Sequence, residues 1–169
     1  MVEEAKPAIK GNMGRAWAIV LVVFLAGFCM PANMGKTMWL AAFILPGYGI
    51  GEGMLGWLNG VFYILGAVIA FPAASFVRKI GIRASVTIAL ACGIAGNIVG
   101  IMSGSDIIVL MVSRIIEGAG FGLMGVIGVV AIAPWFPREK RGLPLGIWGI
   151  WVALANAITP IIDTAIAEA

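Results

Sequence analysis

Two charged residues, Arg114 and Glu117, lie inside an otherwise apolar stretch of the sequence that runs from Ile107 to Trp135. A spacing of three places both side chains on one face of a helix, where they can form an ion pair. A charge inside a membrane helix costs about 2.5–3.5 kcal/mol on insertion scales, and it usually faces a bundle interior or a wet cavity. The planar guanidinium suits a carboxylate or a similar oxyanion. Two interpretations therefore stay open: Arg114 contacts a solute, or it pairs with Glu117 inside the bundle.

Glu117 offers a second kind of chemistry, because a carboxylate in apolar surroundings can exchange a proton. The neighbouring arginine acts in the opposite direction, since it favours the charged carboxylate. A proton-carrying Glu117 and a purely ion-pairing Glu117 both fit the sequence.

Other polar side chains lie in or beside the apolar runs. Asn33 and Lys36 come near the end of the first run, and single asparagines follow at Asn59, Asn97 and Asn156. Such asparagines commonly make interhelical hydrogen bonds worth about 0.6 kcal/mol each. Lys36 can either reach the membrane interface with its long side chain or attract anions into a cavity.

The composition indicates an integral membrane protein rather than a water-soluble enzyme. Of the 169 residues, 62% are hydrophobic and only 11% are charged, against about a quarter in soluble domains. The same figures exclude a disordered chain. The sequence has no histidine, which excludes histidine-based catalytic triads and imidazole metal sites. We expect neither a cofactor nor an enzymatic activity, and we expect free thiols at Cys29 and Cys92.

The uncharged runs predict an all-α bundle of membrane helices. A bilayer core of about 30 Å needs about 20 helical residues. The run over 37–51 is too short and contains Pro46 and three glycines, so we predict an extension of the first span followed by an external loop. Arg114 and Glu117 are included in one long span. The five predicted spans are 16–38, 54–77, 84–104, 107–135 and 142–162.

Basic residues predict the orientation of these spans. Nine of the eleven lie in the tail over 1–15 or in the loops after the second and fourth spans, whereas Lys36 lies on the other side. Basic loops face the cytoplasm, so we predict a multi-pass cell-membrane protein with a cytoplasmic N-terminus. The bilayer is its expected partner, and no nucleic acid is expected. Residues 163–169 are predicted to be an external segment before a sixth span, which makes the remainder of a longer chain a further partner.

Three motifs in this order resemble the major facilitator superfamily. They are the basic turn over 78–83, the pattern Arg-x-x-x-Gly-x-Gly formed by Arg114, Gly118 and Gly120, and the loop over 135–142. The chain looks closest to the bacterial cyanate and nitrate/nitrite type anion porters. The resemblance implies the first five spans of a twelve-helix fold.

The resemblance also assigns roles to residues. Arg78, Lys79, Gly81 and Arg83 align with the family's gating loop, although Arg78 stands where the family usually has an acid. The loss of that acid puts the cytoplasmic latch in doubt.

The family's central cavity is lined by the first and fourth spans. The resemblance therefore implies that Asn33, Lys36 and Arg114 share it, with Glu117 beside them.

Glycines in the fourth span predict close helix packing. Gly118, Gly120 and Gly122 are small residues of the kind that lets helix backbones approach.

Taken together, we expect secondary active transport of a small solute by alternating access. Arg114 favours an anion, and a coupled proton is an option. The alternative is a small, non-transporting membrane assembly or interaction protein.

Overall fold

The computed structural model describes residues 12–167, and its regular structure in this range is helical throughout. Five stretches are long and apolar enough to cross a membrane, which confirms the predicted all-α class and the number of spans. The α-helices are α1 (Met13–Ala32), α2 (Lys36–Trp39), α3 (Ala41–Tyr48), α4 (Glu52–Ile80), α5 (Ile82–Met102), α6 (Ile107–Ile132), α7 (Gly142–Gly149) and α8 (Trp151–Ala167). Two short 3₁₀ turns, η1 (Ala133–Trp135) and η2 (Arg138–Lys140), join α6 to α7.

The first apolar segment is broken, whereas a single span over 16–38 was expected. The helix α1 ends at Ala32, and α2 begins at Lys36. Gly35 is a poor helix former, and the regular pattern is lost between Ala32 and Lys36, where the nitrogens of Asn33 and Met34 bond to carbonyls only three residues back. The region over 37–51, where an extension of the first span and an external loop were expected, contains the short helices α2 and α3. The break leaves backbone carbonyls free to accept other donors.

The other ends of the chain also differ from the expected boundaries. Helix α8 continues to Ala167, so residues 163–167 of the expected external segment are helical and extend the fifth apolar helix beyond its expected end at 162. Residues 168–169 lie outside the described residues. Of the expected N-terminal tail over 1–15, residues 1–11 lie outside the described range, and α1 already begins at Met13.

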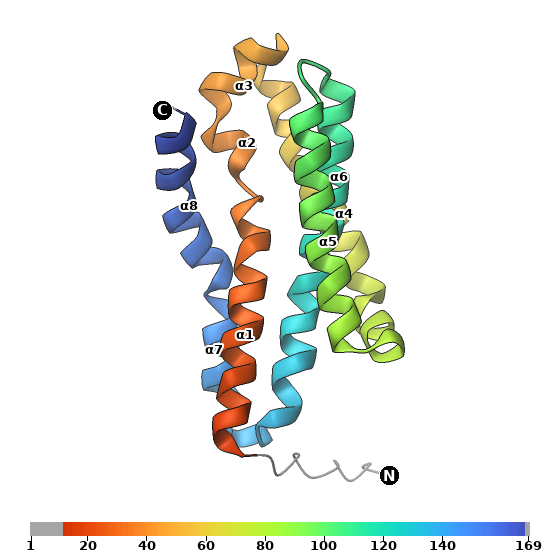
Figure 1. Ribbon diagram of the computed structural model, residues 1–169, viewed down its shortest axis with the longest axis vertical. Coiled ribbons are helices and arrows are strands. Elements are labelled where there is room, and N and C mark those ends of the chain that lie inside the picture. Colours follow the sequence, from red (N-terminus) through yellow and green to blue (C-terminus); the bar gives the residue numbers. More distant parts are fainter. Residues whose placement is uncertain (1–11, 168–169) are drawn as a thin grey trace.

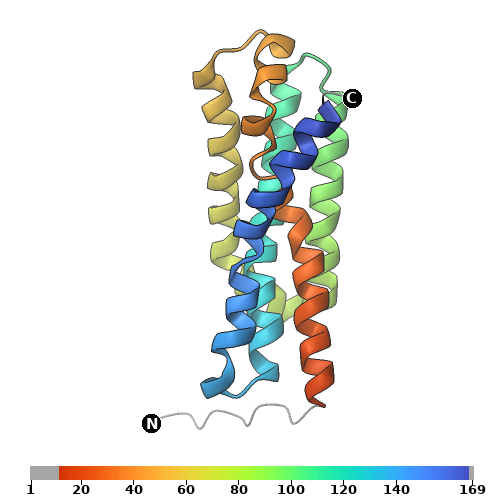
Figure 2. The same cartoon turned by 90° about the vertical axis from the view of Figure 1, so that its left-hand side faces the viewer.

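Helix α6 lies at the centre of the bundle, with α4 and α5 packed along it and α1 on another side (Figure 1). Of its most apolar window, 56% is buried, against 22–28% in the other four spans. Helix α8 packs against α1 and α2, as both views show (Figure 2). The two charges of α6 therefore lie on the most enclosed helix of the described bundle.

Glycines explain how closely α6 approaches its neighbours. A Cβ atom on Gly118 would lie 3.0 Å from the Cα atom of Phe62 on α4, and one on Gly120 would lie 2.7 Å from the carbonyl oxygen of Ala89 on α5. Gly122 faces the backbone of Gly66 in the same way. These three glycines allow the helix backbones to come within contact distance.

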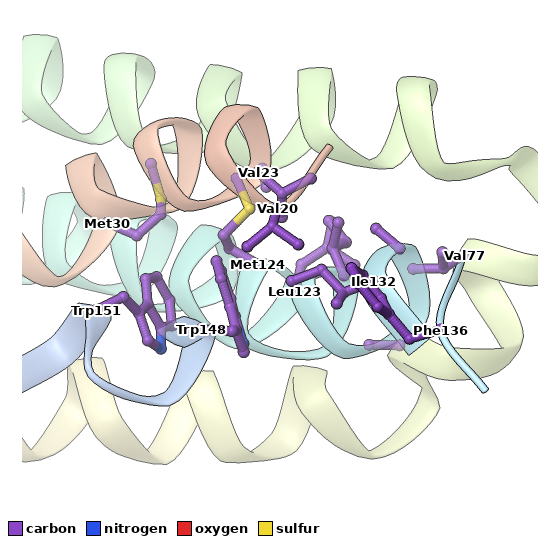
Figure 3. Close-up of a cluster of buried hydrophobic side chains, with 14 of the residues drawn as sticks. Val20, Val23, Met30, Val77, Leu123, Met124, Ile132, Phe136, Trp148 and Trp151 are labelled. Atoms are coloured by element: carbon purple, nitrogen blue, oxygen red, sulfur yellow. The ribbon is translucent and has the colours of Figure 1, made fainter. Parts of the chain in front are cut away.

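An apolar core fills the half of the bundle where α1 begins (Figure 3). Trp148 stacks on Trp151 with ring centroids 4.4 Å apart, and its ring fills the space left by Gly27 and Gly128. Large apolar side chains on the outer surface are exposed, such as Phe71 at 95%, as expected for a lipid-facing surface. The buried charges Arg114 and Glu117 lie outside this core, in the other half of the bundle.

Candidate functional site

The four residues predicted to bind solute or couple transport lie together where α1 breaks beside α6. They are Asn33, Lys36, Arg114 and Glu117, and we call them the charged cluster. Nη1 of Arg114 donates to Oε2 of Glu117, and Nζ of Lys36 donates to Oε1 of the same carboxylate. The side chains of Arg114 and Glu117 are 0% and 1% exposed. Glu117 therefore joins two cations that are 78 residues apart in the sequence.

Arg114 also holds the broken end of α1. Its Nη2 atom donates to the backbone carbonyls of Asn33 at 2.9 Å and Met34 at 3.0 Å. Its guanidinium lies 4.6 Å above the centre of the Phe62 ring, a cation–π contact. A cation is favourable at the C-terminal end of a helix, where free carbonyls carry partial negative charge. Arg114 is thus committed to protein groups on three sides.

Lys36 is the more accessible cation of the cluster. Its ammonium donates to Oδ1 of Asn97 at 2.9 Å and to Oδ1 of Asn33 at 3.3 Å, in addition to its ion pair with Glu117. Its side chain is 21% exposed, whereas that of Arg114 is fully buried. Because Asn33, Asn97 and Glu117 already accept from the ammonium, a solute that binds Lys36 has to replace one of these partners.

The other asparagines differ in their surroundings. Asn59 accepts a hydrogen bond of 3.1 Å from Thr37 on α2, and Asn97 joins the cluster through Lys36. Asn156 on α8 is half-buried. The structure brings Asn59 and Asn97 to the broken first segment, which their positions in the sequence did not indicate.

Sequence reasoning missed Asp163, which it placed in an external segment. The structure places Asp163 half-buried on α8, the helix that packs against α2, which Lys36 begins. A signal was present in the sequence. Ala155, Thr159 and Asp163 recur every four residues, and the first two are buried on one face of α8.

The residues of the predicted gating loop lie at the other end of the bundle, where α4 meets α5. Arg78, Lys79 and Arg83 are exposed, and Nη2 of Arg78 donates to Ser75 at 3.2 Å. Gly81 separates the two helices with a φ of 87°, a conformation that favours glycine. The structure does not bring these four residues to the charged cluster.

The charged cluster has chemistry suited to binding an anion. It contains two cations and one carboxylate within mutual hydrogen-bonding contact, so it carries one excess positive charge. Electrostatic attraction is strong in apolar surroundings, where water screens little. The cluster therefore has a net positive charge, and Lys36 is its more exposed cation.

Comparison with known proteins identifies the family. The family model described as Major Facilitator Superfamily matches residues 14–169. The uncharacterized MFS-type transporter YcnB of Bacillus subtilis (strain 168) is 27% identical over 148 residues, which are 86% of this chain and 31% of the relative. The uncharacterized MFS-type transporter YhcA of the same organism is 25% identical over 152 residues, which are 88% of this chain and 28% of the relative.

The chain spans less than a third of the length of these two relatives. Their names state no substrate, so they give no support to a cyanate or nitrate specificity. No solved structure matches the chain significantly. The family match covers nearly the whole chain and agrees with the five apolar helices. The chain belongs to the major facilitator superfamily, a family of multi-pass membrane transporters and not of enzymes.

Proposed function

We propose that the complete protein moves a small anionic solute across the membrane by secondary active transport with alternating access. The observation that supports this most is the charged cluster at the break between α1 and α2. Glu117 is ten residues from the start of α6, or about 15 Å along the helix axis. That distance is about half of the hydrocarbon core of a bilayer. A binding group at this depth is what a carrier with a central site requires.

Lys36 is the proposed solute contact. Its side chain is partly exposed, and its ammonium donates to the oxygens of Asn33 and Asn97. Arg114 has a different proposed role, because all its contacts are with Glu117, Phe62 and the end of α1. It keeps the broken first segment in place and holds Glu117 beside Lys36.

Glu117 is the proposed internal partner that the solute replaces. When an anionic group binds to Lys36, it replaces Oε1 of Glu117 as a hydrogen-bond acceptor of the ammonium. Oε1 of Glu117 is then free to accept a proton. Glu117 is therefore the candidate for a coupled proton. Because the cluster has one excess positive charge, a small monoanion fits best, of the kind represented by cyanate, nitrate, nitrite and formate.

We propose further that the N-terminus is cytoplasmic. Seven described basic residues lie at the end of the bundle where α1 begins, which we call the basic end. They are Arg15, Arg78, Lys79, Arg83, Arg138, Lys140 and Arg141. Positive residues in short loops favour the cytoplasmic side. The gating loop with Arg78, Lys79, Gly81 and Arg83 would then act at the cytoplasmic mouth.

The test uses the full-length purified protein and a panel of sodium salts of cyanate, nitrate, nitrite and formate, with neutral urea as a comparison. We expect at least one of these anions to raise the apparent Tm and to enter proteoliposomes in a saturable manner. The variant Lys36→Gln should lose both effects. The matched control Lys140→Gln removes an exposed lysine of η2 and should keep both. Stabilisation by none of the four anions, or unchanged uptake in Lys36→Gln, would contradict the proposal.

A further inference from the structure

Helix α8 brings a second acid to Lys36. The helices α2 and α8 are in contact and lie side by side in both views (Figures 1 and 2). Asp163 lies on α8, and the packing of α8 against α2 brings it to the side of the bundle where Lys36 begins α2. Direct ion pairing of Lys36 is with Glu117. The ammonium is therefore influenced by two carboxylates that come from different helices.

The two carboxylates are held differently. Both oxygens of Glu117 are committed, one to Lys36 and one to Arg114. In contrast, Oδ2 of Asp163 is buried and has no hydrogen-bond partner among the described residues. A buried polar atom without a partner is unfavourable by about 1–3 kcal/mol. Asp163 can therefore move away from Lys36 with fewer broken hydrogen bonds than Glu117 can.

Asp163 also changes the charge of the site. The charged cluster alone has one excess positive charge, and the carboxylate of Asp163 cancels it. An anion that approaches Lys36 is therefore repelled by a second carboxylate, which comes from α8. Like charges at a binding site lower affinity and select against partners of that charge.

We propose that Asp163 is an internal counter-ion of Lys36, which an anionic solute must displace, and that it thereby sets the affinity of the site for anions. This inference rests on the function proposed above, in which Lys36 is the anion contact. Asp163 is a specificity-determining residue in this scheme. It keeps the ammonium neutralised while the site is empty, and it weakens anion binding enough to allow release.

The test measures the half-saturating concentrations of nitrate and cyanate for the full-length protein, by thermal shift and by proteoliposome uptake. The variant Asp163→Asn removes the competing charge and should lower these concentrations about tenfold. Asp163→Glu restores the charge and should bind as the wild type does. Asp163→Ser is a second neutral variant, and it should show the same gain if the asparagine variant is poorly folded.

Asp106→Asn is the matched control. Asp106 is an exposed acid that caps α6 by accepting from the backbone nitrogen of Ile108 at 2.8 Å, and asparagine caps helices equally well. This variant changes the net charge by the same amount away from Lys36, so it should leave anion affinity unchanged. A purely structural Asp163 would give weaker or unchanged binding in both neutral variants, which would overturn the inference.

The outcomes separate the two proposals. If wild type binds an anion, Lys36→Gln does not, and the neutral variants at Asp163 bind no tighter, the counter-ion role fails while the transport proposal stands. If neither nitrate nor cyanate binds to the wild type or to the neutral variants at Asp163, the counter-ion role is overturned.

Discussion

Arg114 on α6 donates a hydrogen bond of 3.0 Å to the backbone carbonyl of Met34, which lies eighty residues earlier in the chain at the break after α1. The acceptor is free because the regular helix is interrupted between Ala32 and Lys36, and the nitrogen of Met38 bonds to Gly35 instead. The same guanidinium holds Glu117, and Glu117 holds Lys36. One buried side chain therefore links the irregular backbone of the first segment to the charges of the candidate site.

The first prediction concerns this link. Arg114→Gln should reduce uptake by the full-length transporter to background, because it releases both the end of α1 and Glu117. Removing one partner of a buried ion pair typically costs about 3–5 kcal/mol, so the apparent Tm should fall as well. Uptake into proteoliposomes and thermal unfolding of the purified variant are the measurements.

Arg114→Lys tests whether charge alone is sufficient. Lysine keeps the positive charge but lacks the planar fork that contacts Glu117 and two carbonyls at once. We expect its uptake to stay near that of Arg114→Gln. Wild-type uptake in the lysine variant would show that the backbone contacts are dispensable.

The second prediction concerns the orientation of Lys36 by Asn97. Asn97→Ala removes the oxygen that accepts from the ammonium at 2.9 Å, and hydrogen bonds to charged groups contribute about 1.5–3 kcal/mol. The half-saturating anion concentration should rise about tenfold. Asn156→Ala on α8 is the control and should change it less than twofold. Equal effects of the two variants would remove Asn97 from the site.

The third prediction concerns the packing of α6 on α4. A Cβ atom on Gly122 would lie 2.7 Å from the carbonyl carbon of Gly66, and backbone cannot rotate out of the way as a side chain does. Gly122→Ala should therefore destabilise the protein by about 1–3 kcal/mol. Gly125→Ala is the control, since its Cβ atom meets nothing within 4 Å. A lower apparent Tm in the first variant alone is the expected result.

Much of the fold could be predicted from the sequence because lipid imposes simple rules. A spanning segment must satisfy its backbone hydrogen bonds internally, so long apolar runs read directly as helices. The spacing of Arg114 and Glu117 correctly placed both on one helix face, where they form an ion pair. The ends of the first and last helices were harder. The helix propensities of Gly35 and Asp163 do not show which neighbouring helix packs against the chain at these positions.

The sequence pointed to the four residues of the charged cluster, but it indicated neither Asn97 and Asp163 beside them nor the geometry of their contacts. Asn33, Lys36, Arg114 and Glu117 were each expected at or near a cavity. That Arg114 is fully enclosed and Lys36 partly exposed depends on how α1, α5 and α6 pack. Contacts between residues about eighty positions apart, such as Lys36 with Glu117, follow from tertiary packing and not from periodicity.

The last prediction concerns orientation in the membrane. Ser105 lies in the exposed turn before α6, and Gly142 begins α7 at the basic end. The background variant has alanine in place of its own thiols, Cys29 and Cys92. A single cysteine is introduced into it at position 105 or at position 142. Each of these variants is treated with a thiol reagent that cannot cross membranes. If the basic end faces the cytoplasm, intact cells should label a cysteine at position 105, and a cysteine at position 142 should react only after the membrane is opened. The reverse pattern would turn the bundle over and place Lys36, which lies in the half opposite the basic end, nearer the cytoplasm.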